Sequence, residues 1–328
     1  MKLSDIGEFA LIERLAGRIH NVAPDEVIVG IGDDAAVWRS GNEYLMATTD
    51  TMVEGVHFSP GSAPWADVGW KAMATNLSDI AAMGGWPPFV ALVSLAMPPD
   101  AYIEAIAELY EGLSACARQY GVSVVGGDTV RAPQVSITVA LIASAKTHAG
   151  KPRVLRRDMA QAGDVIAVTG TLGDSAGGLR RLKDGCAATD SLARRHLKPE
   201  PRITTGTEAA QRGILCAIDI SDGLVQDIGH ICERSGVGAE LNATAIPRSA
   251  DLRAAFPKEA LQLACTGGED YELALVGRPR IIEKMAAETN HQLTVIGKIV
   301  ADPPRKVRVL NENGVEVRFD RAGWDAFR

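Results

Sequence analysis

The stretch LCAIDISDGL, residues 215–224, joins an apolar run to an acidic turn and to the start of a helical pattern. Residues 215–220 have the apolar character of a buried strand, and residues 223–235 continue with helical periodicity. A strand that leads through a short turn into a helix is typical of folds in which sheets are covered by helices. We therefore expect α/β or α+β architecture.

The same alternation of strands and helices extends outward from this stretch. In the first half, the pattern predicts helices over 4–19, 65–83 and 101–120, and strands over 27–31, 44–47, 90–97, 122–125 and 135–145. After a basic connecting segment at 146–157, it predicts strands over 164–169, 215–220, 271–276 and 294–300, and helices over 174–183, 202–211 and 223–235. We expect two domains, residues 1–148 and 149–328, because a chain of 328 residues favours about two domains.

The composition is that of a globular protein, with 46% hydrophobic and 23% charged residues. The net charge of −7 disfavours binding to nucleic acid or to anionic membranes. Apolar runs stay well short of the roughly 18 residues of a membrane-spanning helix, and the N-terminus lacks the hydrophobic region of a signal peptide. The five cysteines form no CxxC pair, which favours buried thiols in a reducing cytoplasm.

Carboxylates recur beside glycine, serine or threonine in six segments, most of them at expected strand ends or turns. The segments are GIGDDAA at 30–36, TTDT at 48–51, NLSD at 76–79, GGDT at 126–129, DISDG at 219–223 and GGEDY at 267–271. TTDT is expected to end its strand, GGDT to follow the strand 122–125, and NLSD to lie inside a helix. Any one segment is compatible with an ordinary turn or helix cap. Six together fit a shared cation better, because crowded carboxylates repel one another unless a cation joins them.

Oxygen ligands of this kind suit Mg²⁺, which often bridges protein carboxylates to substrate phosphates. The six histidines lack the spacing of a zinc site. Neither a GxxxxGK[ST] segment nor a GxGxxG segment is present, since Ala35 stands where the third glycine would be. The glycine-rich turn at 170–178 is equally compatible with a phosphate contact and with a capped helix packed on a sheet.

The motifs resemble, in content and order, those of the thiamine-monophosphate kinase family. They are GIGDDAA at 30–36, TTDTMVEGVHF at 48–58, NLSDIAAMGG at 76–85, GGDT at 126–129, TGTLGDSAGG at 169–178, RHLKPEPR at 195–202, DISDGL at 219–224 and GGEDYEL at 267–273. GGDT and SDGL also occur in the wider superfamily of aminoimidazole ribonucleotide synthetase-like, ATP-dependent proteins. EGVHF, RHLKPEPR and GGEDYEL are much more specific to the thiamine-monophosphate kinases.

This resemblance implies a two-domain aminoimidazole ribonucleotide synthetase-like fold. Its N-terminal α/β domain would bind ATP and Mg²⁺ and pair its strands across a homodimer, and its C-terminal α+β domain would complete the active site. The reaction implied is transfer of the ATP γ-phosphoryl group to thiamine monophosphate (TMP), which gives thiamine diphosphate. Several Mg²⁺ ions would be held by Asp34, Thr48, Thr49, Asp50, Asp79, Asp128, Asp219 and Asp222. ATP would contact Tyr110, Gly127, Asp128, Arg157 and Ser221, and TMP would contact His57, Glu269 and Trp324.

The chemistry of two phosphate-bearing substrates agrees with this resemblance. Phosphoryl transfer needs in-line alignment of two anions and neutralisation of their charge, which metal-loaded carboxylates supply. We assign no catalytic base or nucleophile, because the acceptor phosphate oxygen is already ionised at neutral pH.

Other functions remain as alternatives. A selenophosphate synthetase would have a reactive cysteine near the N-terminus, where this chain has its first cysteine at Cys116, and a hydrogenase-maturation relative would have a C-terminal cysteine, where this chain has Arg328. Aminoimidazole ribonucleotide synthetase itself lacks GGEDYEL in this context. A non-catalytic sensor of Mg²⁺ and nucleotide belongs to a different functional class, and ATP consumption in the presence of TMP distinguishes it from a kinase.

Overall fold

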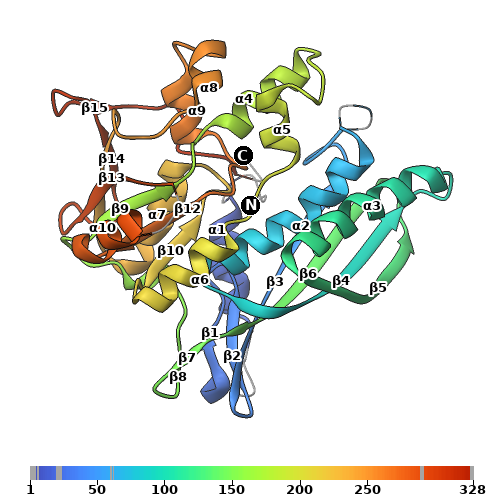
Figure 1. Ribbon diagram of the computed structural model, residues 1–328, viewed down its shortest axis with the longest axis horizontal. Coiled ribbons are helices and arrows are strands. Elements are labelled where there is room, and N and C mark those ends of the chain that lie inside the picture. The colour runs from blue at the N-terminus through green and yellow to red at the C-terminus, as the bar shows by residue number, and fades with distance from the viewer. Residues whose placement is uncertain are drawn as a thin grey trace.

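The computed structural model describes residues 5, 7–19, 24–59, 61, 63–288 and 292–325. Within these residues the chain forms a sheet of six strands and a sheet of seven strands, with helices packed around both (Figure 1). A short hairpin of β7 (Thr147–His148) and β8 (Lys151–Pro152) follows the first sheet in the chain. No helix among the described residues is long and apolar enough to cross a membrane.

The first sheet is built from the first half of the chain. Its strands are β1 (Val27–Val29), β2 (Ala36–Ser40), β3 (Glu43–Val53), β4 (Trp86–Met97), β5 (Val122–Arg131) and β6 (Ser136–Ala145), in the order β1-β2-β3-β6-β4-β5. Neighbouring strands are antiparallel, apart from the parallel pair β4 and β5. Buried and half-buried residues alternate along β6, whereas β5 lies at the sheet edge and is mostly exposed.

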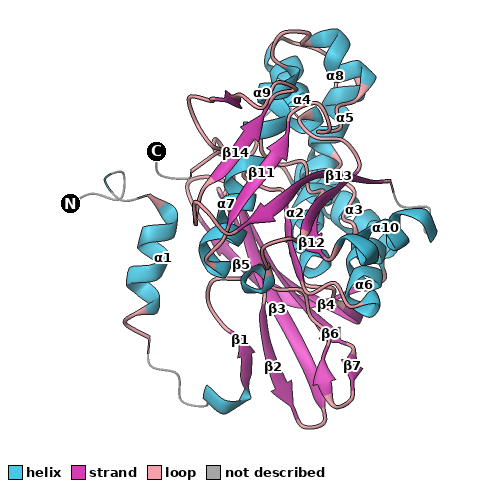
Figure 2. Cartoon of the chain, turned by 90° about the vertical axis from the view of Figure 1, so that its left-hand side faces the viewer, coloured by secondary structure: helices cyan, strands magenta, loops and turns pink. Residues whose placement is uncertain are grey.

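The helices of the first half differ in how closely they pack. Helices α2 (Trp65–Ala82) and α3 (Ile103–Tyr120) pack against each other, α2 against β3 and β6, and α3 against β5. Helix α1 (Glu8–Ala16) lies to one side of both sheets, and the 3₁₀ helix η2 (Pro24–Glu26) leads into β1 (Figure 2).

The second sheet is built from the second half of the chain. Its strands are β9 (Val165–Thr169), β10 (Cys216–Asp219), β11 (Gly238–Asn242), β12 (Leu273–Gly277), β13 (Leu293–Val300), β14 (Val307–Leu310) and β15 (Glu316–Val317), in the order β10-β12-β9-β13-β11-β14-β15. Its helices are η3 (Arg157–Met159), α4 (Asp174–Lys183), α5 (Ser191–Leu197), α6 (Ile203–Arg212), α7 (Leu224–Ser235), α8 (Ala250–Ala255), α9 (Ala260–Thr266) and α10 (Pro279–Glu288). Helix α7 packs on one face, and α10 on the other.

Helix α2 connects the two halves of the molecule. Its residues are buried along almost the whole length, which explains the apolar pattern of this segment. Toward its C-terminal end it also packs against α6, where Gly206 lies directly over the Ala81 carbonyl. Trp70 donates to the Pro199 carbonyl at 2.9 Å, so the start of α2 is also bonded to the second half. Groups on α2 are therefore fixed relative to both sheets.

Most of the expected helices and strands are confirmed, with shifts of a few residues at their ends. Two expectations about the acidic segments are wrong. Residues 126–129 lie inside β5 rather than after it, because their backbone groups pair with β4. Residues 48–51 lie inside β3 rather than at its end, because β6 pairs with β3 as far as Val53. The expected helix at 4–19 is Glu8–Ala16 in the structure, and part of the expected range lies outside the described residues.

The close contact between α2 and α3 depends on Gly69 of α2 and Gly112 of α3, and Gly112 provides a test of this packing. A Cβ added at Gly112 would overlap the Ala66 carbonyl of α2, whereas a Cβ added at Gly229, inside α7, meets nothing within 4 Å. We expect Gly112→Ala to lower the free energy of unfolding by about 1–3 kcal/mol, because the helices must move apart. Gly229→Ala is the matched control and should raise it by about 0.5–1 kcal/mol. Urea unfolding of both variants measures these values, and an unchanged stability of Gly112→Ala would contradict the packing described here.

Candidate active site

A cleft of about 1890 Å³ lies between the two halves of the molecule. It is lined by twelve of the residues named from the sequence: Asp34, Thr48, Thr49, Asp50, His57, Asp79, Arg157, Asp219, Ser221, Asp222, Glu269 and Trp324. They come from β3, α2, η3 and β10, from the loops after β1, β3, β10 and α9, and from the segment after β15, so both halves contribute. The other three residues named from the sequence, Tyr110, Gly127 and Asp128, do not line this cleft.

A group of carboxylates forms the centre of the cleft. One oxygen from each of Asp34, Asp79 and Asp219 lies within 4.8 Å of the other two. Two hydroxyls hold the last two in place, since Thr48 donates to Asp79 Oδ2 and Ser78 donates to Asp219 Oδ2, both at 2.6 Å. The Ser78–Asp219 bond joins α2 to β10, and therefore joins the two halves of the chain at the cluster itself.

These carboxylates are buried or half-buried, and burial penalises their charged form. Burial raises the pKa of Asp79 and of Asp219 well above the ordinary value, and neighbouring carboxylates raise both further. The pKa of Asp50 is raised for the same reasons, burial first. Its backbone N–H donates to the Asn76 side chain at 3.0 Å, which fixes β3 against α2. The cluster is therefore unfavourable in its fully ionised state unless cations join it.

Arg157 is a cation that the structure pairs with this cluster. Its guanidinium forms an ion pair with Asp34, and its backbone N–H donates to Asp33 Oδ2 at 3.2 Å. Burial alone would lower the pKa of Arg157, but Asp34 and Asp33 more than offset this, so the guanidinium stays charged. Burial, and then the charge of Asp34, still raise the pKa of Asp33 to about 7. One guanidinium thus neutralises only part of the charge, and the oxygen-rich donor set fits Mg²⁺.

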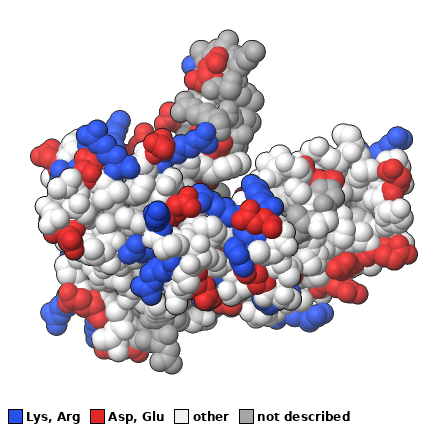
Figure 3. Space-filling view, turned by 90° about the horizontal axis from the view of Figure 1, so that it is seen from above, with Lys and Arg blue, Asp and Glu red and all other residues white. Residues whose placement is uncertain are grey.

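The strong local charge of the cleft contrasts with the outer surface. Seen from above, Lys and Arg side chains are interspersed with Asp and Glu side chains on that face (Figure 3). A net charge of −7 spread over 328 residues produces only a weak average field. The face seen in Figure 3 thus carries charges of both signs, whereas three carboxylates are crowded together in the cleft.

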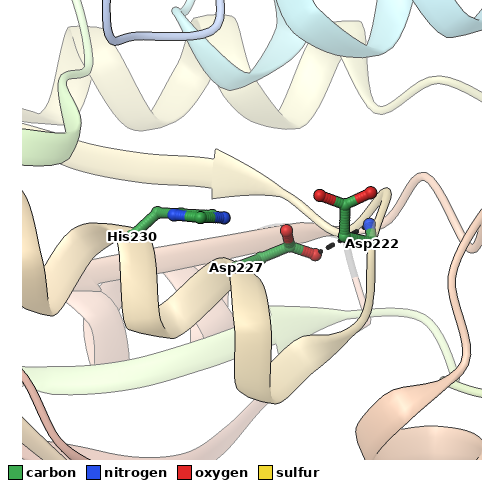
Figure 4. Close-up of side chains that lie close together, drawn as sticks. All are labelled: Asp222, Asp227 and His230. Atoms are coloured by element: carbon green, nitrogen blue, oxygen red, sulfur yellow. Dashed lines mark hydrogen bonds between the residues drawn. The ribbon is translucent and has the colours of Figure 1, made fainter. Parts of the chain in front are cut away.

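A second group of possible ligands lies beside the first and includes residues that the sequence analysis did not identify. Asp222 in the turn before α7 and Asp227 and His230 on α7 bring one ligand atom each within 4.8 Å of the others (Figure 4). Asp227 Oδ2 accepts the backbone N–H groups of Asp222 at 3.2 Å and Gly223 at 3.0 Å. Burial, and then the charge of Arg157, lower the pKa of His230 to about 4, so its imidazole is neutral at pH 7. The spacing of 227 and 230 on one helix face was the available signal.

The other end of the cleft has aromatic, basic and acidic groups. The rings of His57 and Trp324 have centroids 6.1 Å apart. His57 Nδ1 accepts the Val53 N–H at 3.0 Å, which leaves Nε2 to carry the proton of the neutral ring. Glu269 forms an ion pair of 2.7 Å with Lys71, and its other oxygen lies 3.4 Å from His196 Nδ1. Lys71 and His196 also line the cleft, and neither was identified from the sequence.

Two predicted site residues occupy less direct positions. Thr48 and Asp50 alternate with Thr49 along β3, so the Thr49 side chain points to the opposite face, where its hydroxyl donates to the Val139 carbonyl at 3.1 Å. Ser221 lies in the turn after β10, and its carbonyl accepts the Glu269 N–H at 2.7 Å.

The residues Gly127 and Asp128 lie on the edge strand β5. Gly127 pairs with Val93, Val93 with Val139, and Val139 with Asp50, so three strand-to-strand steps separate Gly127 from Asp50. At a strand spacing of nearly 5 Å, Gly127 is about 14 Å from Asp50 along the sheet. Tyr110 is part of α3 and is 37% exposed. Within one chain, these residues are therefore remote from the carboxylate cluster.

The glycine-rich turn at 170–178 favours the capped-helix interpretation. The backbone N–H groups of Gly173 and Ser175, at the start of α4, donate to the Asp270 carboxylate at 2.7 and 3.2 Å. A carboxylate of the chain itself thus occupies this helix N-terminus.

Comparisons with known proteins agree with this geometry. Residues 32–145 match the model of the AIR synthase related protein, N-terminal domain, and residues 161–310 match that of the C-terminal domain. The chain is 42% identical over 304 residues to the thiamine-monophosphate kinase of Haemophilus influenzae, covering 90% of this chain and 89% of that protein. Its structure is similar to that of AaThiL complexed with AMPPCP and TMP, with a TM-score of 0.85, 32% identity and 99% of both chains covered. The thiamine-monophosphate kinase from Stenotrophomonas maltophilia K279a matches with a TM-score of 0.74 and 38% identity, over 94% of this chain and 98% of that one.

The raised carboxyl pKa values predict how stability depends on pH without metal. A carboxyl whose folded pKa is raised contributes stability that is present below its unfolded value of 3.8 and is lost as pH rises through the folded value. Asp219→Asn removes this loss while keeping size and an acceptor for Ser78. We expect the metal-free variant to be more stable than the parent at pH 8, by at least about 1 kcal/mol, and by less at pH 5.5. Thermal unfolding in EDTA measures both differences.

Comparing variant with parent cancels the opposite pH dependence of the buried histidines, His57, His196 and His230, whose pKa values are lowered. Asp190→Asn is the matched control, because the Arg181 side chain lowers the pKa of Asp190 and its effect should be the same at pH 5.5 and 8. Adding Mg²⁺ at pH 8 should stabilise the parent more than Asp219→Asn. An Asp219→Asn variant that is less stable than the parent at both pH values in EDTA would contradict the interpretation of the cluster.

Proposed function

The chain belongs to the thiamine-monophosphate kinase family, and from this we propose that its cleft transfers the γ-phosphoryl group of ATP directly to TMP, giving thiamine diphosphate. The observation that carries the proposal is the buried carboxylate cluster of Asp34, Asp79 and Asp219 with only partial neutralisation by Arg157. Such a cluster repels phosphates by itself, and attracts them when it holds cations. A cleft that must bring two phosphate groups together needs this property.

We assign the metal-binding role to Asp34, Asp50, Asp79 and Asp219, with Asp222 as a further ligand beside them. Mg²⁺ bound there supplies neutralisation of the charge on the transferred phosphoryl group. The hydroxyls of Thr48 and Ser78 orient the carboxylates through hydrogen bonds of 2.6 Å, and Arg157 contributes a fixed positive charge next to them. Thr49 helps to hold β3 in place beside β6, because its hydroxyl donates to the Val139 carbonyl.

Direct transfer explains why the site needs no protein nucleophile. The attacking group is a phosphate oxygen of TMP, which is ionised at neutral pH, so no base has to remove a proton. The protein residues have to hold the two phosphates in line and exclude water. We assign ATP contacts to Arg157 and Ser221, and contacts with the thiamine portion to His57, Glu269 and Trp324. The permanent positive charge of the thiazolium ring suits both a carboxylate and an aromatic face.

We further propose that the working unit is a homodimer whose partner completes the nucleotide site. Tyr110, Gly127 and Asp128 do not line the cleft of their own chain. The edge strand β5 and its neighbour β4 expose the apolar side chains of Leu92 at 43% and Val125 at 62%. An exposed apolar edge is a surface that proteins normally cover. A second copy seated there brings its own Gly127 and Asp128 toward the cleft of the first.

In this proposal, residues 1–148 carry the metal ligands of β3 and α2 and the dimer surface, and residues 149–328 complete the cleft. We place the reaction in the cytoplasm, because the five cysteines are free and four of them, Cys116, Cys216, Cys232 and Cys265, are buried.

The direct test of the activity is a product assay. Purified protein with ATP, Mg²⁺ and TMP should form thiamine diphosphate, and EDTA should abolish the reaction. Asp50→Asn should lower kcat by at least about a hundredfold, because a ligand of the charge-neutralising cations is lost. Asp251→Asn, an exposed aspartate of α8, is the control and should leave kcat unchanged. Binding of ATP and Mg²⁺ without any product would instead favour a nucleotide sensor.

The dimer proposal is tested by mixing two inactive variants. Asp50→Asn and Asp128→Asn should each be inactive alone. If each site combines Asp50 of one chain with Asp128 of the other, mixed dimers contain one intact site. Random exchange makes half of the dimers mixed, so the mixture should recover about a quarter of the parent activity. No recovery after demonstrated subunit exchange would place both residues in a site made by one chain.

A further inference from the structure

The pair formed by Lys71 and Glu269 is a feature of the cleft that phosphoryl transfer alone does not explain. Lys71 lies on α2, its side chain is only 4% exposed, and its ammonium group is 2.7 Å from Glu269 Oε1. Burying a lysine is costly unless an anion accompanies it. The pair joins α2 of the first half to the loop before β12 in the second half. A buried charge pair at the wall of a substrate cleft calls for a specific role.

The two charges are arranged in a definite order. The Glu269 side chain is 28% exposed, against 4% for Lys71, so the carboxylate faces the cleft and the ammonium lies behind it. His196 approaches the second carboxylate oxygen at 3.4 Å, and its own Nδ1 lies 3.0 Å from the Ser175 hydroxyl. Burial, and then the charge of Lys71, lower the pKa of His196 to about 3, so this ring is neutral at pH 7. The positive charge beside Glu269 is therefore that of Lys71.

The backbone also fixes where the Glu269 carboxylate lies. Glu269 has φ +64° and Tyr271 has φ +51°, a region that side-chain-bearing residues rarely occupy. Hydrogen bonds hold this loop, since the Glu269 N–H donates to the Ser221 carbonyl at 2.7 Å and the Tyr271 N–H to the Ile220 carbonyl at 2.9 Å. The loop is thus held against the turn that carries Asp222, at a cost in backbone strain.

The pair lies at the end of the cleft away from the carboxylate cluster. Lys71, Thr75 and Asp79 follow one another at four-residue spacing on the face of α2 that lines the cleft. Lys71 is therefore about 12 Å from Asp79 along the helix, at 1.5 Å per residue. His57 lies within electrostatic range of both Lys71 and Glu269. When the phosphate of TMP is held at the cluster, its ring system extends toward this end.

We propose that Lys71 is a positioning residue that keeps Glu269 ionised and directed into the cleft, so that the carboxylate binds the cationic ring system of TMP. This inference rests on the proposed function and names the residue that supports recognition of the acceptor. Lys71 acts through Glu269 and does not touch the substrate. The ammonium behind the carboxylate makes an anion available in a place where burial would otherwise make it neutral.

The electrostatics of Glu269 support this assignment. Burial is the largest influence and would raise the pKa of its carboxyl, but Lys71, followed by His196 and His57, lowers it below the ordinary value. The groups that face Glu269 are Lys71 from α2, His196 from α5, His57 from the turn after β3 and Tyr271 from its own loop. With Lys71 removed, burial dominates and favours the protonated form of the carboxyl.

The experiment compares Lys71→Met, Lys71→Arg, Glu269→Gln and the double variant Lys71→Met/Glu269→Gln. KM for TMP, KM for ATP and kcat are measured between pH 6 and 9. Lys71→Met should raise KM for TMP about 10- to 100-fold at pH 6.5, the scale of a lost charge-assisted contact. This increase should shrink toward pH 9 as Glu269 ionises again. Lys71→Arg should stay close to the parent, and KM for ATP should change less than about threefold in each variant.

The remaining variants separate an indirect role from direct contact. Glu269→Gln should raise KM for TMP at every pH without recovery, and the double variant should match Glu269→Gln. Lys198→Met removes a lysine that pairs with Asp67 at 3.1 Å on the same side of α2, and it should leave KM for TMP unchanged. Melting temperatures show whether Lys71→Met folds. If Lys71→Met does not fold, the double variant, which leaves no unpaired buried charge, is compared with Glu269→Gln instead.

A KM increase in Lys71→Met that is independent of pH, or that adds to the effect of Glu269→Gln, would overturn the proposal, because Lys71 would then contact the substrate itself. An unchanged KM for TMP would overturn it as well. Failure of the proposed function is recognised separately, since the parent enzyme itself would then form no thiamine diphosphate.

Discussion

The repulsion among buried carboxylates is the constraint on which the rest of this structure depends. Asp34, Asp79 and Asp219 come from three distant parts of the sequence, namely the loop after β1, helix α2 and strand β10, and one oxygen of each is held within 4.8 Å of the others. Such crowding opposes folding unless the surrounding scaffold is rigid and cations are available. Helix α2 supplies the rigidity, since it is packed between α3 and α6 and bonded to β10 through Ser78. The metal-free protein thus has a lower folding stability because of this site, and the repulsion is relieved when cations bind to the carboxylates.

The sequence was sufficient to predict the three carboxylates of the central cluster, and it was insufficient for Asp227 and for the groups that support Glu269. It also named Asp128, which does not line the cleft of its own chain. Aspartates beside glycine and serine in turns, as in 219–223, are visible locally because turn chemistry selects those residues. Lys71 and His196 lie in ordinary helical patterns, and only tertiary packing brings them to Glu269. Asp227 and His230 were also missed, although their spacing on one face of α7 was a local signal. The segment 126–129 was misplaced because pairing with β4 overrides the preference of glycine for turns.

The cleft has a polarity along α2 that matches the polarity of the acceptor. Its cluster end is strongly acidic and suits phosphates through cations, while its other end presents a single carboxylate with an ammonium behind it. TMP has a doubly charged phosphate at one end and a cationic ring system at the other. A molecule with this distribution of charge can lie along the cleft in one direction only, because the reverse orientation places like charges together.

The close contact between α2 and its neighbouring helices also has a consequence for how this protein can change over evolutionary time. The backbones of these helices approach closely at three glycines: Gly69 of α2 and Gly112 of α3 where α2 meets α3, and Gly206 of α6 where α2 meets α6. Larger residues at these positions would displace α2. A displacement would move Lys71 and Asp79 together, so the proposed acceptor recognition and the proposed metal binding would be lost in the same step. New acceptor preferences are therefore more accessible through the loops at 54–59 and 267–271 than through the helix. The positions where α2 packs against α3 and α6 therefore tolerate few substitutions, even though they do not contact a substrate.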